Sequence, residues 1–249
     1  MKATIEYNSR KIQIDVSQPI DISIAIDVTK QHINAWYVDD PKIFPEKVDE
    51  YEISVANGAV VNFNNIHFNP HSHITHTECV GHITEIVHSV NQHLKHYFFV
   101  AEVVTVAPEK LNGDFVISEK QLKTALRNKK RDAIVIRTLP NLIDKKKKRY
   151  SNTNPTYLLE EAAIYLREKG IKHLLIDVPS VDKENDGGKL LAHNAFWNTA
   201  GKVRMDATIT EFIFVPNSVE DGEYLLNLMI APFENDATPS KPILYKIMN

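Results

Sequence analysis

The sequence predicts one α/β domain spanning residues 1–249. A strand, a helix and a second strand follow one another between residues 133 and 178, as in a βαβ unit. Hydrophobic residues make up 43% of the chain and charged residues 24%, which is typical of a globular protein. The chain has no internal repeat and no linker rich in Gly or Ser that would divide it.

The first part of the chain predicts strands interrupted by a long loop. Apolar and polar side chains alternate in KIQIDV and DISIAI, which is the pattern of half-buried strands. Residues 31–50 show no period and are expected to form a loop, in which Trp36, Tyr37 and Phe44 either wall a binding site or anchor the loop. Strands are predicted at residues 11–16, 21–26, Tyr51–Val55 and Ala59–Phe63.

The rest of the chain mixes helical and strand patterns. Ser118 with Gln121 forms a capping-box pattern, and the helical spacing after the Asn154-Pro155 pair ends at Gly170. Helices are predicted at Ile83–His96, Ser118–Leu126 and Asn154–Lys169. Strands are predicted at Tyr97–Val106, residues 133–138, Ile171–Val178, Ala207–Val215, Tyr224–Ile230 and Ile243–Ile247.

Composition excludes several classes of protein. One cysteine rules out an internal disulfide framework and a Cys-rich zinc module. A net charge of -3 argues against broad electrostatic binding to nucleic acid. No apolar run is long enough to span a bilayer, and the first residues lack the apolar core of a signal peptide. We therefore expect a soluble, cytoplasmic protein that binds neither nucleic acid nor membrane.

Histidine is the one residue type whose distribution is unusual. Eight of the 11 histidines lie between His67 and His96. Imidazole and carboxylate are ligands of Zn²⁺ and Mn²⁺, and an extended segment places His76 and Glu78 on the same face. His88, His93 and His96 fit the exposed side of a helix and are expected to have no role.

A third ligand is expected just before this pair. His71 and His73 are both candidates, but each has the wrong parity for the His76 face of a strand. A bulge, or a bend near Pro70, would bring one of them to that face. Strand parity leaves the choice between the two histidines open.

Two segments resemble the cyclase-like metal-dependent hydrolases, a family that includes kynurenine formamidase and isatin hydrolase. Residues 75–82 (THTECVGH) are similar to the family signature Thr-His-x-Asp-x-Pro-x-His. Residues 170–182 (GIKHLLIDVPSVD) are similar to a second family segment, Gly-x5-Ile-Asp-x-Pro-Ser-x-Asp. The resemblance extends from about Asp21 to the C-terminus. It implies a swivelling β/β/α fold with mixed sheets and flanking helices.

The resemblance implies a role for each matching residue. His76 and Glu78 would be metal ligands, with Glu78 in place of the usual Asp. Glu211 would be a distant carboxylate ligand. His82 would be the general base or acid, or a ligand of a second ion. His193 would be either a second-site ligand or a catalytic proton shuttle.

The sequence also departs from the family pattern. The family has a histidine four residues before the central one, where this chain has Ser72 between His71 and His73. We favour His71 as the first ligand, with His73 as the alternative. Ile74 and Val80 replace a family glycine and proline. These changes indicate a divergent branch of the family.

The resemblance implies an enzyme that hydrolyses carbon–nitrogen bonds other than peptide bonds. Its small-molecule substrate would be an amide, a formamide or a cyclic amide, as for an arylformamidase. One or two divalent ions, Zn²⁺ first and Mn²⁺ second, would activate water, and His82 would accept a proton from it. Asp177 and Asp182 would either hydrogen-bond a ligating histidine or lie in a solvated turn. A homodimer or homotetramer would complete the active-site wall.

Three other interpretations compete with this one. The first is a metal- or ligand-binding protein that keeps the family fold without turnover. In the second, Cys79 would be a nucleophile and His82 its general base, but an extended strand turns Cys79 away from His76. The basic runs Lys129–Arg131 and Lys145–Arg149 are expected to be solvated loops, because no aromatic residues interleave with their lysines.

Overall fold

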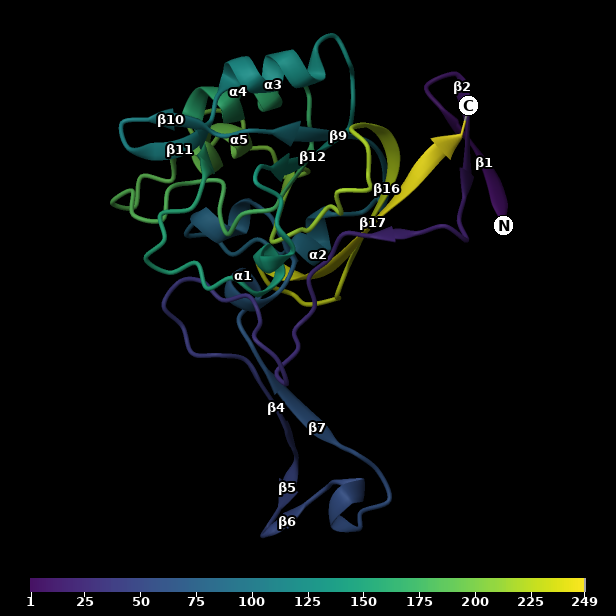
Figure 1. The fold of residues 1–249 in the computed structure, drawn as a ribbon, viewed down its shortest axis with the longest axis vertical. Helices are drawn as coiled ribbons and strands as arrows, with labels where there is room; N and C mark the ends of the chain where they lie inside the picture. The colour runs from purple at the N-terminus through teal and green to yellow at the C-terminus, as the bar shows by residue number, and fades with distance from the viewer. Residues whose placement is uncertain (249) are drawn as a thin grey trace.

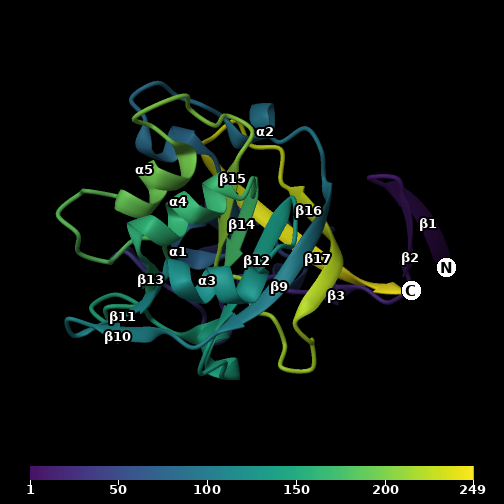
Figure 2. The same ribbon diagram turned by 90° about the horizontal axis from the view of Figure 1, so that it is seen from above.

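The fold is a closed, barrel-like sheet with helices along one side. We describe residues 1–248 in a computed structural model. Within these residues, seven strands close a ring because β17 pairs with both β16 and β8 (Figures 1 and 2). The strands of the ring are β8 (His76–Glu78), β9 (Phe98–Val106), β12 (Ala133–Thr138), β14 (His173–Ile176), β15 (Thr208–Glu211), β16 (Gly222–Ile230) and β17 (Ala237–Met248).

Four neighbouring strands of the ring, β9, β12, β14 and β15, run parallel. The predicted βαβ unit is confirmed, since α4 connects the parallel strands β12 and β14. Ile134 and Ile136 pack into the cluster beneath the helices, whereas Val135 packs into the interior of the ring. Figure 2 shows α3 (Glu119–Leu126), α4 (Glu160–Glu168) and α5 (Leu191–Trp197) on the same side of these strands.

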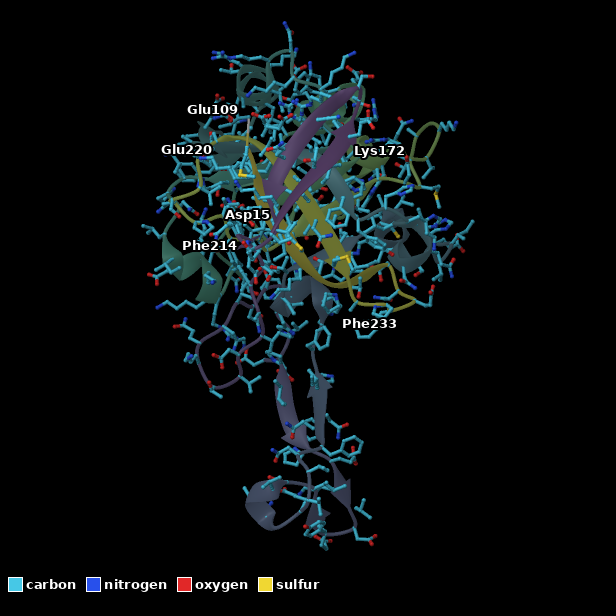
Figure 3. All side chains as sticks on the ribbon, turned by 90° about the vertical axis from the view of Figure 1, so that its right-hand side faces the viewer. Asp15, Glu109, Lys172, Phe214, Glu220 and Phe233 are labelled. Carbon is cyan, nitrogen blue, oxygen red and sulfur yellow. The ribbon has the colours of Figure 1, made fainter. Side chains whose placement is uncertain are left out.

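An N-terminal hairpin, β1 (Lys2–Tyr7) and β2 (Arg10–Asp15), extends the sheet beside the end of β17 (Figure 3). The predicted strand at residues 11–16 is confirmed within β2, but β1 was not predicted. The predicted strand at residues 21–26 is wrong beyond Asp21, which ends β3 (Ile20–Asp21). Its carboxylate accepts hydrogen bonds from the backbone and hydroxyl of Ser23, at 2.9 and 2.6 Å, and this local turn ends the strand.

Residues 42–67 form an arm that projects from the body (Figures 1 and 3). The predicted loop at 31–50 therefore contains strands, and the predicted strand Ala59–Phe63 is wrong. Gly58 adopts a left-handed conformation, and the Ala59 N–H donates to Ser54 O, so the chain turns there. The arm consists of β4 (Lys42–Pro45), β5 (Lys47–Val48), β6 (Tyr51–Glu52), the 3-10 helix η1 (Val55–Asn57) and β7 (Asn64–His67).

The helix predicted at Ile83–His96 is wrong. Ile86 and Val87 are 70% and 83% exposed, and the Val90 N–H donates to Asn235 O, 2.9 Å away, instead of to a preceding turn. Among the described residues, no helix has both the length and the apolar character needed to span a bilayer. The short helices here are α1 (Pro70–His73), the 3-10 helix η2 (Val80–Ile83) and α2 (Val90–His93).

The helix predicted at Asn154–Lys169 starts later than expected, at Glu160. The residues before it form β13, which pairs in parallel with β11 instead of continuing the helix. The helix predicted at Ser118–Leu126 is confirmed, and Gln121 Oε1 accepts the Ser118 N–H at 3.0 Å. The remaining elements are β10 (Glu109–Leu111), β11 (Asp114–Ile117), the 3-10 helix η3 (Ile143–Lys147) and β13 (Tyr157–Leu158).

Buried His173 predicts a loss of stability in acid. Burial lowers the pKa of His173 to about 3, and its ring contacts Phe99, with the ring centroids 3.9 Å apart. The unfolded chain takes up a proton near pH 6.5, so stability is full above that pH and falls as the pH drops towards 3. The slope contributed by this group is at most about 1.4 kcal/mol per pH unit.

Urea unfolding between pH 7 and pH 4 measures this contribution. We expect the free energy of unfolding to fall less steeply with decreasing pH in His173→Asn than in the wild type, since Asn does not titrate. Parallel curves for the two proteins would show that His173 is not the acid-sensitive group.

Candidate metal centre

The site lies on the outer face of the ring where β8 joins β15. His76 pairs in register with Glu211, and the side chains of His76 and Glu78 point to the helix side. Thr77 points the opposite way and hydrogen-bonds Thr210 at 2.8 Å. The predicted strand parity of His76 and Glu78 is therefore confirmed. Both side chains are fully buried.

His71 reaches the site from the short helix α1. The Asn69 side chain accepts the His71 N–H at 2.9 Å, and Pro70 occupies the first helical position. This turn places His71 Nδ1 3.2 Å from Glu78 Oε2. His73 lies elsewhere, because its Nδ1 accepts the Asn69 N–H at 3.0 Å and its Nε2 faces Asn34. The parity problem disappears because this segment is helical, not extended.

His193 enters from α5 and is held by two carboxylates. Its Nε2 lies 3.2 Å from Glu78 Oε1, and its Nδ1 lies 2.6 Å from Asp182 Oδ2. Asp182 also accepts the backbone N–H groups of Ala192 and His193, at 2.7 and 3.0 Å. Asp182 is thus the carboxylate that orients a candidate ligand, as the sequence suggested for it.

Glu211, the distant carboxylate, lies beside His76. Its Oε2 is 3.4 Å from His76 Nε2, and its Oε1 accepts the Val181 N–H at 3.0 Å. The next residue, Phe212, has a left-handed backbone with φ 56°, which is uncommon for an aromatic residue. Its ring packs 5.9 Å from that of His76. Glu211 therefore has one oxygen fixed by the backbone and the other directed at the histidine.

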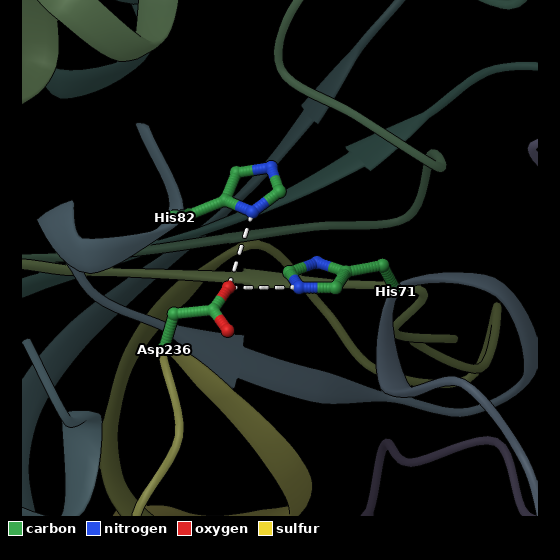
Figure 4. A group of neighbouring side chains, drawn as sticks. All are labelled: His71, His82 and Asp236. Atoms are coloured by element: carbon green, nitrogen blue, oxygen red, sulfur yellow. Dashed lines mark hydrogen bonds and ion pairs between the residues drawn. The ribbon is translucent and has the colours of Figure 1, made fainter. Parts of the chain in front are cut away.

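His82 comes from η2 and meets Asp236, a residue that the sequence did not suggest. Asp236 Oδ2 lies 3.2 Å from His82 Nδ1 and 3.0 Å from His71 Nε2 (Figure 4). The two imidazole rings stack with centroids 4.2 Å apart. Asp236 lies in the connection from β16 to β17 and matches no motif. Only the pairing of β17 with β8, which the sequence does not reveal, brings it to the site.

Opposite charges stabilise one another throughout this cluster. Burial alone would lower the pKa of His71, but its contacts with Asp236 and Glu78 raise the pKa to about 10. Burial is likewise outweighed at His193, where Asp182 and Glu78 raise the pKa to about 10. The pKa of Glu78 is held well below its usual range, against its burial, by His82, His193 and His71. Without a cation, these pKa shifts favour an ionised Glu78 beside protonated His71 and His193.

The donor atoms fit a divalent metal. Among the described residues, His76 Nε2 and Glu78 Oε2 are buried and have no hydrogen bond of good geometry, although Glu211 Oε2 and His71 Nδ1 lie 3.4 and 3.2 Å from them. The 3.2 Å contact from His71 Nδ1 to Glu78 Oε2 is close to the roughly 3.3 Å between two ligands of a tetrahedral zinc ion. Three overlapping groups of side chains could each hold an ion, since within each group the ligand atoms lie within 4.8 Å of one another. The groups are His71–His76–Glu78, Glu78–His82–His193 and His71–His82–Asp236.

A cavity of about 310 Å³ opens beside the cluster. Trp36 lines it, and the Trp36 indole N–H donates to His71 O at 3.0 Å. Ser72, at the position of the family histidine, also lines it, and its buried hydroxyl has no partner in residues 1–248. Tyr37 donates to Glu184 at 2.7 Å at the rim, whereas Phe44 lies on the projecting arm. Of the three predicted wall aromatics, only Trp36 lines the cavity.

Asp177 and the basic runs are not part of this cluster. Asp177 accepts from the Lys145 ammonium at 2.7 Å and from the Thr138 backbone at 2.9 Å, so it orients no histidine. Arg131 donates to buried Glu102 at 2.9 Å. The expectation of fully solvated basic loops is therefore wrong for Lys145 and Arg131, which anchor these loops to the sheet.

Cys79 is turned away from the cluster, as strand parity predicted. Its thiol is fully buried and donates to His88 O at 3.2 Å. Burial raises the pKa of Cys79 to about 11, so the thiolate that a nucleophile requires is scarce at neutral pH. The geometry therefore disfavours the pairing of Cys79 with His82 as nucleophile and base.

Residues 14–183, more than half of the chain, match the family model Cyclase, described as "Putative cyclase". The chain belongs to the cyclase family. This result confirms the family suggested by the two sequence motifs. A search of curated proteins found no match.

Solved structures with the same fold cover nearly the whole of this cyclase-family chain. A potential metal-dependent hydrolase with cyclase activity is 15% identical, with a TM-score of 0.65, and the match covers 92% of this chain and 97% of the other. An isatin hydrolase bound to the product analogue thioisatinate is 14% identical, with a TM-score of 0.65 and 93% coverage of both chains. Isatin hydrolase A from Labrenzia aggregata, bound to benzyl benzoate, is 12% identical, with a TM-score of 0.68 and coverage of 93% and 94%. These similarities confirm the predicted cyclase-like α/β fold.

Replacing His76 with Ala is expected to abolish tight binding of a divalent ion. The change deletes a buried ring nitrogen that makes no hydrogen bond within residues 1–248 and lies 3.4 Å from Glu211 Oε2. Zinc content after dialysis, measured by atomic emission, tests this, with His96→Ala as the control at an exposed histidine. Equal zinc content in the wild type and His76→Ala would refute the site.

Proposed function

We propose that this protein is a metal-dependent hydrolase that cleaves a small amide, a formamide or a cyclic amide. The proposal depends on the buried cluster of imidazoles and carboxylates beside a cavity of about 310 Å³, in which His76 Nε2 and Glu78 Oε2 make no hydrogen bond to a described residue. The names of the structural neighbours, metal-dependent hydrolase and isatin hydrolase, support the same reaction class.

His71, His76 and Glu78 would hold one divalent ion. Zn²⁺ is the first choice and Mn²⁺ the second, since both accept imidazole and carboxylate ligands. Glu78 also faces His193 through its other oxygen, so Glu78 and His193 would help to hold a second ion, with Glu211 as the more distant carboxylate. When bound, such an ion would polarise a carbonyl and lower the pKa of water, so that hydroxide is available as a nucleophile near neutral pH.

His82 is the group we assign to proton transfer. Its side chain lines the cavity and is 31% exposed, whereas those of His76 and His193 are nearly completely buried. A base at this position accepts a proton from water and returns it to the leaving nitrogen. The His193 ring is held by Asp182 at 2.6 Å. We therefore favour the role of metal ligand for His193 over that of proton shuttle.

His82→Ala is expected to keep at least one bound ion and to lose turnover by about 10²–10⁴-fold, the usual contribution of a general base. The measurement is kcat on zinc- or manganese-loaded protein with N-formyl aromatic amines, lactams and other cyclic amides. His96→Ala serves as the control and is expected to keep wild-type turnover. No hydrolysis by fully metallated wild type across this panel would favour a binding protein without turnover.

The arm provides a reason to propose a homodimer or homotetramer. A two-stranded ribbon is only marginally stable in water by itself, and this one exposes many large apolar side chains, which indicates a binding surface. Its strand β7 leads directly into Asn69 and the site helix α1. The exposed apolar side chains are Ile43, Phe44, Val48, Tyr51, Val55, Val60, Val61, Phe63 and Ile66.

Phe63→Ser combined with Val60→Asp is expected to shift the assembly towards the monomer. Val60 is 97% exposed and Phe63 59% exposed, so neither change removes a core contact within the chain. Sedimentation velocity measures the outcome, and Val87→Ser is the matched control because Val87 is 83% exposed outside the arm. A monomeric wild type, or no shift in the arm variant, would contradict the proposed assembly.

A further inference from the structure

Asp236 hydrogen-bonds two histidines of the cluster through a single oxygen. Its Oδ2 lies 3.0 Å from His71 Nε2 and 3.2 Å from His82 Nδ1 (Figure 4). His71 is a candidate ligand and His82 the candidate base, so this carboxylate contacts both parts of the machinery. Glu78 and Glu211 face candidate ligand atoms directly, and Asp182 contacts the ring of His193 alone.

The backbone fixes Asp236 beside the strand that carries the ligands. Its carbonyl accepts the Cys79 N–H at 3.0 Å, directly after Glu78. The next residue, Ala237, pairs in register with Glu78 where β17 closes the ring. The position of the Asp236 carboxylate is therefore set by the same pairing that closes the barrel, and not by a free loop.

A neutral imidazole that donates through one ring nitrogen presents a lone pair on the other. Donation from His71 Nε2 to Asp236 leaves the lone pair on Nδ1, which is the atom 3.2 Å from Glu78 Oε2. Donation from His82 Nδ1 leaves the lone pair on Nε2, which faces Glu78 at 3.9 Å. The same acceptor therefore fixes the proton on Nε2 in His71 and on Nδ1 in His82.

We propose that Asp236 is a positioning residue that sets the tautomers of both His71 and His82. It makes Nδ1 the ligating atom of His71 and Nε2 the basic atom of His82. The inference rests on the proposed metal site of the hydrolase, but its test requires no substrate. Carboxylates that accept the second N–H of a ligating histidine commonly improve metal affinity by 10–100-fold.

The experiment compares Asp236→Ala and Asp236→Asn with the wild type. Glu234→Ala is the matched control, since Glu234 lies on the same connection and accepts from Asn91 and Gln92 at 2.6 and 2.8 Å, outside the site. Zinc affinity is measured by competition with a chromophoric chelator. Ring tautomers are measured by long-range ¹H–¹⁵N correlation spectra of the zinc-loaded proteins, with circular dichroism as the check of folding.

In the wild type we expect His71 with its proton on Nε2 and His82 with its proton on Nδ1. Asp236→Ala is expected to weaken zinc binding by about 10–100-fold and to move the His82 proton to Nε2, the form that free histidine prefers. Asp236→Asn keeps an oxygen acceptor and should recover part of the affinity. Glu234→Ala should match the wild type in both measurements.

Unchanged tautomers in Asp236→Ala would overturn the proposal even if zinc affinity fell, because the role would then be only structural. Affinity equal to that of Glu234→Ala would overturn it as well. A wild type that binds no zinc or manganese would instead refute the proposed function. In that case the His82 tautomer, compared between metal-free wild type and Asp236→Ala at alkaline pH, still decides whether Asp236 orients the ring.

Discussion

The fully buried carboxylate of Glu78 is the constraint on which the rest of the site depends. Removing a carboxylate from water without partners costs several kcal/mol. Glu78 lies where β8 pairs with both β15 and β17, so the partners must come from segments that cover this seam. His71 from α1, His82 from η2 and His193 from α5 supply them. Closure of the barrel and assembly of the cluster are therefore one requirement.

The sequence predicts those parts of the fold that local patterns determine. The buried strands at residues 133–138 and Tyr97–Val106 and the helix beginning at Ser118 are found with nearly the predicted bounds. The prediction of a helix at Ile83–His96 was wrong because it used only the local spacing of apolar residues. In the structure, the Val90 N–H donates to the carbonyl of Asn235, which lies in a connection distant in the sequence. The arm was missed because its strand β4 pairs with β7, a strand that does not follow it directly in the sequence.

The candidate site was predictable to the same extent. His76 and Glu78 follow from strand parity, and the family motifs point to His82, His193 and Glu211. Strand parity did not distinguish His71 from His73, because the argument assumed an extended segment. The segment is a short helix whose N-cap is Asn69. Asp236 carries no signal in the sequence, since its place depends on the register of two strands far apart in the chain.

The one-residue displacement of the first histidine, relative to the family, follows from that same helix. A helical turn rotates successive side chains by about 100°, so a ligand at position 71 and one at position 72 approach the cluster from different directions. His71 approaches from the side of Asp236, stacks on His82 at 4.2 Å and leaves Ser72 lining the cavity. The displacement therefore affects more than one candidate ligand. It pairs His71 with a carboxylate from the connection between β16 and β17, and it puts the Ser72 hydroxyl in the wall of the cavity.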